Sequence, residues 1–200
     1  MQVIARLLPR FLACGLLAAF LAGCGVNDIP AYDEAVKAAW AQVDNQYKRR
    51  ADLIPNLVEV VKGYAAQEQE TLTAVVEARA KATQTQLPAD LLSNPEAFQR
   101  FEQNQGALTQ ALSRLLVVVE RYPDLKSNQN FLSLQAQLEG TENRIAVARR
   151  DYIQAVQVYN TELRTFPGRI WAALLYSDME PRETFKQPES VAEPPQVKFN

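Results

Sequence analysis

Histidine is absent from this sequence of 200 residues. Its absence excludes Ser-His-Asp and Cys-His catalysis, in which an imidazole is the general base. It also excludes histidine-ligated zinc and the Glu-x-x-His di-metal sites that some helical bundles carry. A site of carboxylates alone could hold a hard cation, but Glu68 and Glu70 lie two residues apart and point to different sides of a helix. We therefore predict no enzymatic activity, cofactor, metal or small-molecule substrate, and an enzyme that uses only carboxylates and arginine is the weakest alternative.

Cysteine occurs only at positions 14 and 24. The first ten residues contain Arg6 and Arg10 but no acidic residue, and an apolar run follows from Phe11 to Leu21. This run is shorter than the roughly 20 apolar residues that a membrane-spanning helix needs. It is typical of the apolar core of an export signal, so residues 1–23 are predicted to be a signal peptide.

Leu21-Ala22-Gly23-Cys24 is similar to a bacterial lipobox, in which an aliphatic residue and two small ones precede the cysteine that receives lipid. A short membrane anchor that ends in Cys is one alternative. Cleavage before Cys14 is another, although Phe11-Leu12-Ala13 fits the pattern poorly. We predict lipid attachment, including palmitate, at Cys24, and a tether over residues 24–31. Each buried acyl CH₂ contributes roughly 0.8 kcal/mol, so two or three chains would anchor the protein stably.

The predicted lipoprotein has no thiol left for a disulfide or a soft metal site. It would lie outside the cytoplasm on the periplasmic face of a membrane. Because Gly25 rather than Asp follows the cysteine, sorting in a Gram-negative envelope would favour the outer membrane.

Concentrated positive charge is also lacking. Without Arg6 and Arg10, the 21 basic residues become 19 against 23 acidic ones, which gives the mature chain a net charge of −4. Surfaces that bind phosphate backbones need concentrated positive charge, so nucleic acid is excluded as a partner.

From Tyr32 onward, apolar residues recur with helical spacing, and no strand pattern competes. Pro55 disrupts a helix interior but is favourable in a first turn. It predicts a tight turn near residues 50–54, between a first helix and a second one that fades by about Thr85. Leu87-Pro88 begins a predicted loop.

Asn94 or Ser93 is predicted to cap a third helix, which Pro123 ends. A fourth helix is predicted from Asn128 to Thr165, with the three-and-four spacing of bundles and coiled coils. The predicted fold class is all-α, an antiparallel up-and-down four-helix bundle over residues 32–176. The Pro-rich tail over residues 177–200 is predicted to be disordered.

Nine aromatic residues fall on the predicted helix faces, and we interpret them as core whose hydroxyl groups need partners at the bundle edge. They are Tyr32, Tyr47, Tyr64, Phe98, Phe101, Tyr122, Tyr152, Tyr159 and Phe166. Thr141, in the polar string Thr141-Glu142-Asn143-Arg144, falls on the apolar stripe of the fourth helix. It is predicted to be half-buried, hydrogen-bonded and important for helix register.

Two basic clusters are candidates for an interaction surface: Lys48, Arg49 and Arg50 in the first, and Arg149 and Arg150 in the second. The simpler interpretation is solvated faces and ion pairs between helices. The alternative is a basic patch that meets anionic headgroups or an acidic partner. Consecutive residues spread around a helix, so one patch would require the fold to bring the two clusters together.

Several longer strings resemble the LemA family. They are Lys48-Arg49-Arg50-Ala51-Asp52-Leu53-Ile54-Pro55-Asn56-Leu57-Val58, Val60-Val61-Lys62-Gly63-Tyr64, Val119-Glu120-Arg121-Tyr122-Pro123-Asp124-Leu125-Lys126, Thr141-Glu142-Asn143-Arg144-Ile145-Ala146, Ala148-Arg149-Arg150, Tyr159-Asn160-Thr161 and Phe166-Pro167. The resemblance covers about residues 32–167 and implies a four-helix bundle attached to a membrane at its N-terminus. It implies no activity, because the molecular function of the family is unsettled.

This sequence departs from the family pattern at three points. The lipobox replaces the usual N-terminal transmembrane helix, which argues against a cytoplasmic bundle. Gln67 follows Tyr64-Ala65-Ala66 where the family commonly has His, and Tyr176-Ser177 replaces a common Gly-Phe pair.

The leading hypothesis is a non-catalytic interaction or scaffold module that binds an envelope protein. The alternative is a structural or lipid-contacting protein. About eight residues separate Cys24 from Tyr32 and reach at most ~29 Å, so the bundle would lie close to the bilayer.

Overall fold

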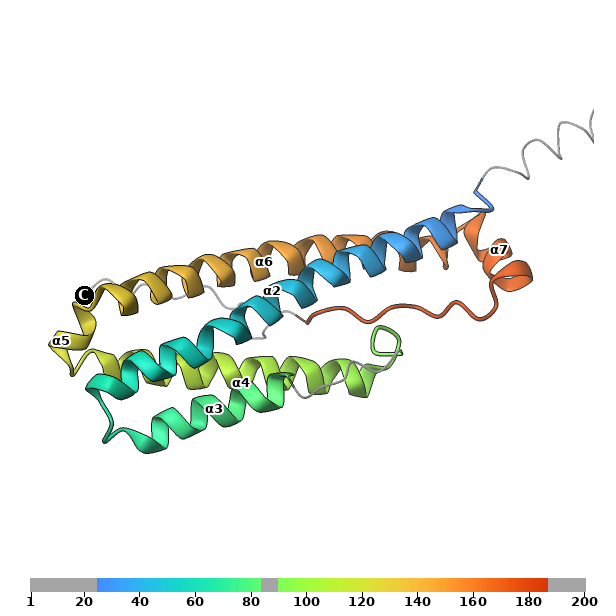
Figure 1. Cartoon of the computed structure of the whole chain (residues 1–200). Coiled ribbons are helices and arrows are strands. Elements are labelled where there is room, and N and C mark those ends of the chain that lie inside the picture. The colour runs from blue at the N-terminus through green and yellow to red at the C-terminus, as the bar shows by residue number, and fades with distance from the viewer. Residues whose placement is uncertain (1–24, 84–89, 187–200) are drawn as a thin grey trace, which may run out of the picture.

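The computed structural model describes residues 25–83 and 90–186, which form helices joined by turns, without a strand in these ranges. The helices are α2 (Asp28–Tyr64), α3 (Gln69–Thr83), α4 (Pro95–Val119), α5 (Pro123–Lys126), α6 (Gln129–Glu162) and α7 (Gly168–Leu175) (Figure 1). The predicted all-α class is confirmed. The predicted signal peptide, Cys24, the loop at Leu87-Pro88 and residues 187–200 lie outside the described residues. Within the described part, no helix has the length and apolar character to span a membrane.

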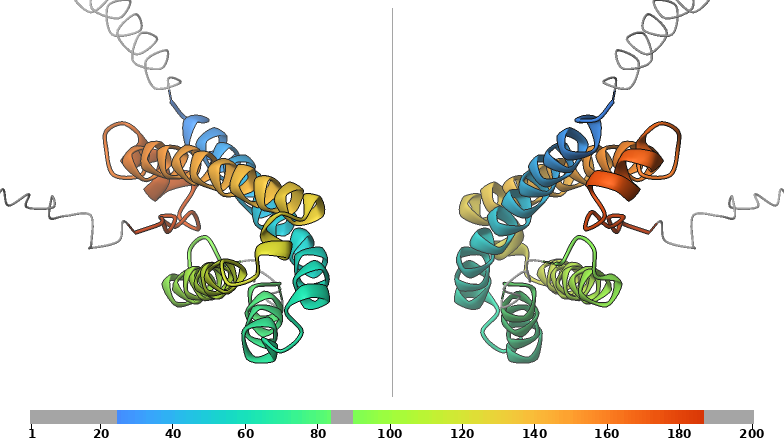
Figure 2. Two further views of the ribbon diagram at one scale, coloured as in Figure 1. Left: turned by 90° about the vertical axis from the view of Figure 1, so that its left-hand side faces the viewer. Right: turned by 90° about the vertical axis from the view of Figure 1, so that its right-hand side faces the viewer.

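The long helices pack in pairs. α2 lies along α6, α3 lies along α4, and α3 also packs on α2 (Figures 1 and 2). The apolar side chains form two buried clusters. One includes Leu57, Leu115 and Leu125 of α5, and the other includes Trp40 and Tyr152, with Trp171 of α7 packed against it.

The predicted turn near residues 50–54 is wrong, because α2 continues through Pro55 to Tyr64. Proline has no N–H, so the carbonyl oxygen of Ala51 loses its intrahelical donor. Arg79 of α3 replaces that donor, and its Nε lies 2.8 Å from the Ala51 oxygen. Ala51 and Leu57 are buried on either side of Pro55. Packing and the Arg79 hydrogen bond therefore hold the helix through a residue that would otherwise end it.

The other helix ends follow the predictions in part. Asn94 caps α4 as predicted, and its Oδ1 accepts a hydrogen bond from the Ala97 amide at 3.1 Å. Pro123 begins the single turn of α5, after α4 has ended at Val119. α6 ends at Glu162, which is earlier than predicted.

The predicted aromatic core is confirmed for five residues and wrong for two. The buried ones are Tyr47, Phe98, Phe101, Tyr152 and Tyr159. Tyr64 is exposed, and Phe166 is 82% exposed because α6 ends before it.

Residues 177–186 differ from the predicted disordered tail, because they run back along the helices and pack against them (Figure 1). The ring of Phe185 is buried between Phe98 of α4 and Tyr152 of α6, with centroid distances of 5.1 Å and 5.6 Å. The Tyr152 hydroxyl donates to the carbonyl of Glu183 at 2.7 Å, and the Tyr159 hydroxyl donates to that of Glu180 at 3.1 Å. The segment thus supplies the partners that the two tyrosines need.

An ion pair ties this segment to the start of α2. Arg182 donates to Oδ1 of the buried Asp33 through Nη2 at 2.7 Å and Nε at 3.0 Å, and Lys37 Nζ lies 2.9 Å from Oδ2. Burial acts to raise the pKa of Asp33, but the hydrogen bonds from Lys37 and Arg182 outweigh it and lower that pKa.

A double-mutant cycle tests how α2 continues through Pro55. We expect Arg79→Met to lower the free energy of unfolding by about 1–3 kcal/mol, because the Ala51 carbonyl loses its donor. In a Pro55→Ala background, residue 55 supplies an N–H, and the cost of Arg79→Met should fall towards zero. Urea unfolding followed by circular dichroism measures all four proteins. An equal cost in both backgrounds would contradict this account of the helix.

The Asp33–Arg182 pair predicts a dependence of stability on pH. Because the folded-state pKa of Asp33 lies below its ordinary value of 3.8, the carboxylate adds stability above that pH. The stability is lost as the pH falls through the folded-state pKa. We expect Asp33→Asn to lose less unfolding free energy than the wild type between about pH 5 and pH 2. Glu34→Gln, which alters the exposed partner of the same Lys37, is the control and should follow the wild type.

Candidate functional site

Arg50 lies at the polar centre of the fold and is only 2% exposed. Its Nη1 donates to Glu142 Oε1 of α6 at 2.9 Å and to Thr109 Oγ1 of α4 at 3.1 Å. Its Nη2 donates to the side-chain oxygen of Gln105 at 2.6 Å and to the Gln105 carbonyl at 3.4 Å. Hydrogen bonds that carry a charge are stronger than neutral ones, so one guanidinium links α2, α4 and α6.

Arg149 and Glu102 lie beside this centre. Nη2 of Arg149 lies 3.8 Å from Oε1 of Glu102, and the guanidinium carbon lies 4.1 Å from the centre of the Phe185 ring. A cation over an aromatic face is attracted to it. Burial raises the pKa of Glu102, and the charge of Arg149 opposes that shift only in part. Both residues line a pocket of about 250 Å³ together with Arg50 and Glu142.

The structure brings together two of the five predicted interaction residues, Arg50 and Arg149. Their contacts are ion pairs between helices, in agreement with the simpler interpretation. Lys48 is exposed and lies 2.6 Å from Asp44 of its own helix. Arg49 is exposed, and Arg150 lies 3.7 Å from its neighbour Asp151.

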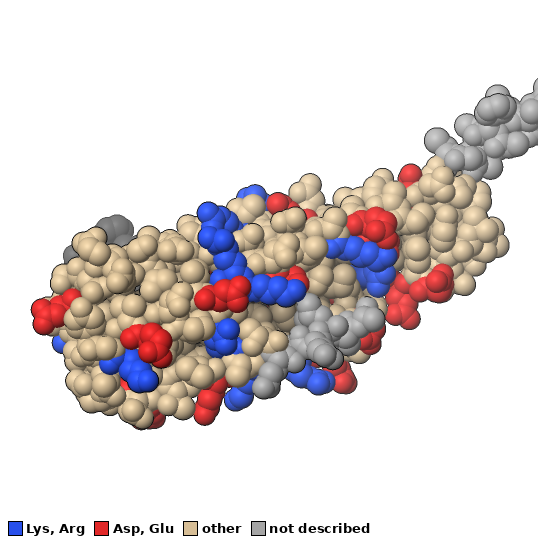
Figure 3. Space-filling model, in the orientation of Figure 1, with Lys and Arg blue, Asp and Glu red and all other residues tan. Residues whose placement is uncertain are grey.

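The visible face of the molecule carries basic and acidic side chains next to one another, without a large patch of one sign (Figure 3). A role in binding for Lys48, Arg49, Arg50, Arg149 and Arg150 stays a prediction.

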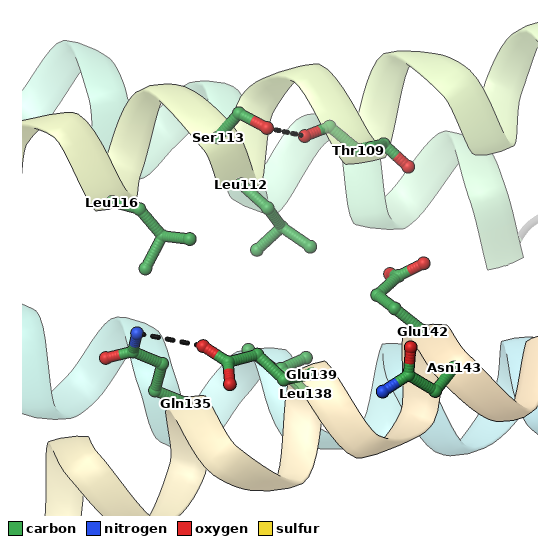
Figure 4. A pocket seen from close by; sticks show the side chains of 9 residues that line it. All are labelled: Thr109, Leu112, Ser113, Leu116, Gln135, Leu138, Glu139, Glu142 and Asn143. Atoms are coloured by element: carbon green, nitrogen blue, oxygen red, sulfur yellow. Dashed lines mark hydrogen bonds between the residues drawn. The ribbon is translucent and has the colours of Figure 1, made fainter.

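An open groove of about 460 Å³ runs between α4 and α6. Leu112 and Leu116 point into it from α4, opposite Leu138 and Glu139 of α6 (Figure 4). Thr109 and Glu142 line both the groove and the pocket of Arg50. The groove therefore adjoins the pocket of Arg50, which the chain's own Phe185 also lines.

Sequence reasoning missed the residues of this site on α4 and in the tail, which are Glu102, Gln105, Thr109 and Phe185. For Arg50 a signal existed: it follows Tyr47 by three positions and precedes Ile54 by four, which is the buried face of a helix that continues. The assumed turn hid that spacing. Thr141 lies on its predicted stripe, fully buried, with its hydroxyl donating to the Gln137 carbonyl at 2.7 Å.

The charged side chains of the site are paired with one another. The charge of Arg50 is balanced by Glu142, and that of Arg149 is partly balanced by Glu102. Over residues 25–83 and 90–186, no group of three or more acidic side chains is arranged to hold a metal ion. The arrangement offers an apolar groove with carboxylates at its edge.

The fold and the site define an all-α protein with an arginine-centred junction of three helices beside an open groove. The profile of the LemA family matches residues 39–199, and the chain belongs to the LemA family.

Two kinds of curated relative are similar to this chain. The magnetosome protein MamQ 1 of Paramagnetospirillum magneticum is 25% identical over 157 residues, which cover 70% of this chain and 58% of that protein. Protein LemA of Metamycoplasma hominis is 24% identical over 140 residues, which cover 70% of this chain and 60% of the relative. The chain thus spans less than two thirds of the length of these relatives.

The Arg50 junction generates a prediction about stability. Glu142→Ala leaves the buried guanidinium without its half-exposed carboxylate, and we expect a loss of about 1.5–3 kcal/mol in unfolding free energy. Glu139→Ala, one turn away in the same groove, is the matched control and should cost no more than about 0.5 kcal/mol. Adding Arg50→Met to Glu142→Ala should recover part of the loss. Similar losses for the Glu142 and Glu139 variants in urea unfolding would refute the role of the junction.

Proposed function

We propose that this protein is a lipid-anchored, non-catalytic interaction module of the cell envelope, and that its α4–α6 groove binds an extended segment of an envelope protein. The observation that carries the proposal is the groove itself, which is open and lined by leucine side chains. Large apolar depressions rimmed by polar groups mark interaction sites.

The chain's own residues 180–186 support this mode of binding. They lie extended beside α6, hold one aromatic side chain between α4 and α6, and accept hydrogen bonds on their backbone carbonyls. Extended peptides are commonly bound in this way, with backbone hydrogen bonds for affinity and a pocket for specificity. The groove adjoins that place, because Thr109 and Glu142 line both the groove and the pocket beside Phe185.

The lining of the groove indicates the chemistry of its occupant. Leu112, Leu116 and Leu138 favour an aliphatic or aromatic side chain. Glu139 stands at the edge and favours a nearby Lys or Arg, through charge complementarity, whereas Glu142 is already paired with Arg50. The partner segment is therefore extended, with an apolar residue next to a basic one.

The anchor and the shape of the domain complete the proposal. Lipid on Cys24 places the domain outside the cytoplasm, and in a Gram-negative envelope on the outer membrane. α2 begins at Asp28, four residues beyond Cys24, so the helices stand next to the bilayer. The long helices α2, α3, α4 and α6 act as one antiparallel four-helix bundle, a rigid scaffold that presents the groove.

Photo-cross-linking in native membranes tests the groove. A photoreactive amino acid replaces Ser113, an exposed groove residue on α4, in the full-length protein. The control carries it at Glu77, an exposed residue of α3. We expect one membrane-associated protein to be captured from position 113 only, through a segment that mass spectrometry maps to an apolar residue beside Lys or Arg. Glu139→Lys should abolish the capture.

Three results would overturn the proposal. The first is the same set of captured proteins from both positions. The second is capture of a second copy of this chain, and the third is a cross-link back to residues 187–200 of the same chain.

A further inference from the structure

The segment around α7 presents an exposed apolar surface. Phe166 is 82% exposed, Leu174 is 70% exposed, and Ile170 and Leu175 are about half exposed. Ile170 and Leu174 lie one turn apart and therefore share a face of the helix. Single exposed apolar residues are ordinary, but four within ten residues are a concentration of the kind that marks an interaction surface.

Another side of α7 packs against the rest of the protein, so Ile170 and Leu174 cannot turn inward. Trp171 and Ala172 pack against the aromatic core cluster. Gly168 is buried, and a Cβ atom at this position would collide with the backbone oxygen of Glu162. Only glycine permits so close an approach. The helix is thus fixed to the end of α6 with its apolar face outward.

The patch lies beside the predicted lipid-attachment site. The Cβ position of Gly25 is 3.5 Å from Cγ of Pro167, which directly precedes α7. Gly25 is joined to Cys24, and consecutive Cα atoms are about 3.8 Å apart. Figure 1 shows α7 next to the start of α2, at the end of the molecule away from α5.

Charge at this end is mixed, because Asp28, Asp178 and Glu180 are exposed there, but the segment around α7 itself is basic. Residues 163–176 contain Arg164 and Arg169 and no acidic residue, and both arginines are exposed. Basic residues are attracted to anionic headgroups. Apolar side chains flanked by cations are typical of short segments that lie in the membrane interface.

We propose that Phe166, Ile170, Leu174 and Leu175 enter the interface of the membrane that holds the Cys24 lipid, with Arg164 and Arg169 at the level of the headgroups. This inference rests on the proposed lipid anchor. The contact adds a second point of attachment, and it turns the α5 end of the helices away from the bilayer. The protein would then stand on the membrane in one orientation.

A single reporter thiol tests the contact in the full-length protein. Lipidated Cys24 has no free thiol, so a cysteine introduced by Leu174→Cys can be labelled alone with an environment-sensitive fluorophore. The matched control is Val117→Cys near the α5 end, because Val117 is 71% exposed against 70% for Leu174. Both proteins are reconstituted in vesicles of phosphatidylethanolamine and phosphatidylglycerol.

On transfer from detergent to vesicles, we expect the emission maximum of the label at position 174 to move to shorter wavelength. The emission maximum of the label at position 117 should stay the same. Lipids with a spin label ~5–10 Å below the headgroups should quench position 174 at least about twofold more than position 117. Equal emission and quenching at both positions in lipidated protein would overturn the contact. The mass of the N-terminal peptide reports the lipid on Cys24 separately, and its absence would overturn the anchor together with the contact.

Discussion

The buried guanidinium of Arg50 is the interaction on which the arrangement of the helices depends. A buried charge is strongly unfavourable unless a partner charge and hydrogen bonds balance it. Arg50 finds these partners only where Gln105 and Thr109 of α4 and Glu142 of α6 meet α2. A shift of one helix along another would remove a partner and leave the charge unbalanced. The junction therefore sets the register of three helices, and with it the position of the groove between α4 and α6.

Arg50 reaches this position only because α2 is continuous. Pro55 comes five residues later and would end the helix if the carbonyl of Ala51 had no donor. Arg79 supplies the donor from α3, so the same hydrogen bond that preserves α2 also joins it to α3. Two arginines thus connect all four long helices. Near the N-terminal end of α2, the ion pair between Asp33 and Arg182 joins residues 177–186 to this helix.

The sequence predicts the helical class, the cap at Asn94 and the buried Thr141, because these follow from local spacing and local hydrogen bonds. It does not predict the continuity of α2, because the donor for Ala51 comes from a residue 28 positions away. The packed segment near Phe185 was missed for a similar reason: its polar, proline-containing composition resembles a disordered tail, and its partners lie on α4 and α6. The sequence predicts Arg50 and Arg149 as residues of the candidate site but not Glu102 or Gln105. These two lie on α4, whose contacts with helices distant in the sequence depend on the tertiary fold.

The central claim is that a partner occupies the α4–α6 groove in the cell envelope, and thiol accessibility in intact cells tests it most directly. Ser113→Cys in the groove and Glu77→Cys on α3 are treated with a membrane-impermeant maleimide, in cells and after purification. The account predicts that position 77 is labelled at the same rate in both, and that position 113 is protected in cells and labelled freely once purified. Equal labelling rates at position 113 in cells and after purification would contradict an occupied groove. A cysteine at position 77 that does not react in intact cells would contradict a domain outside the cytoplasm.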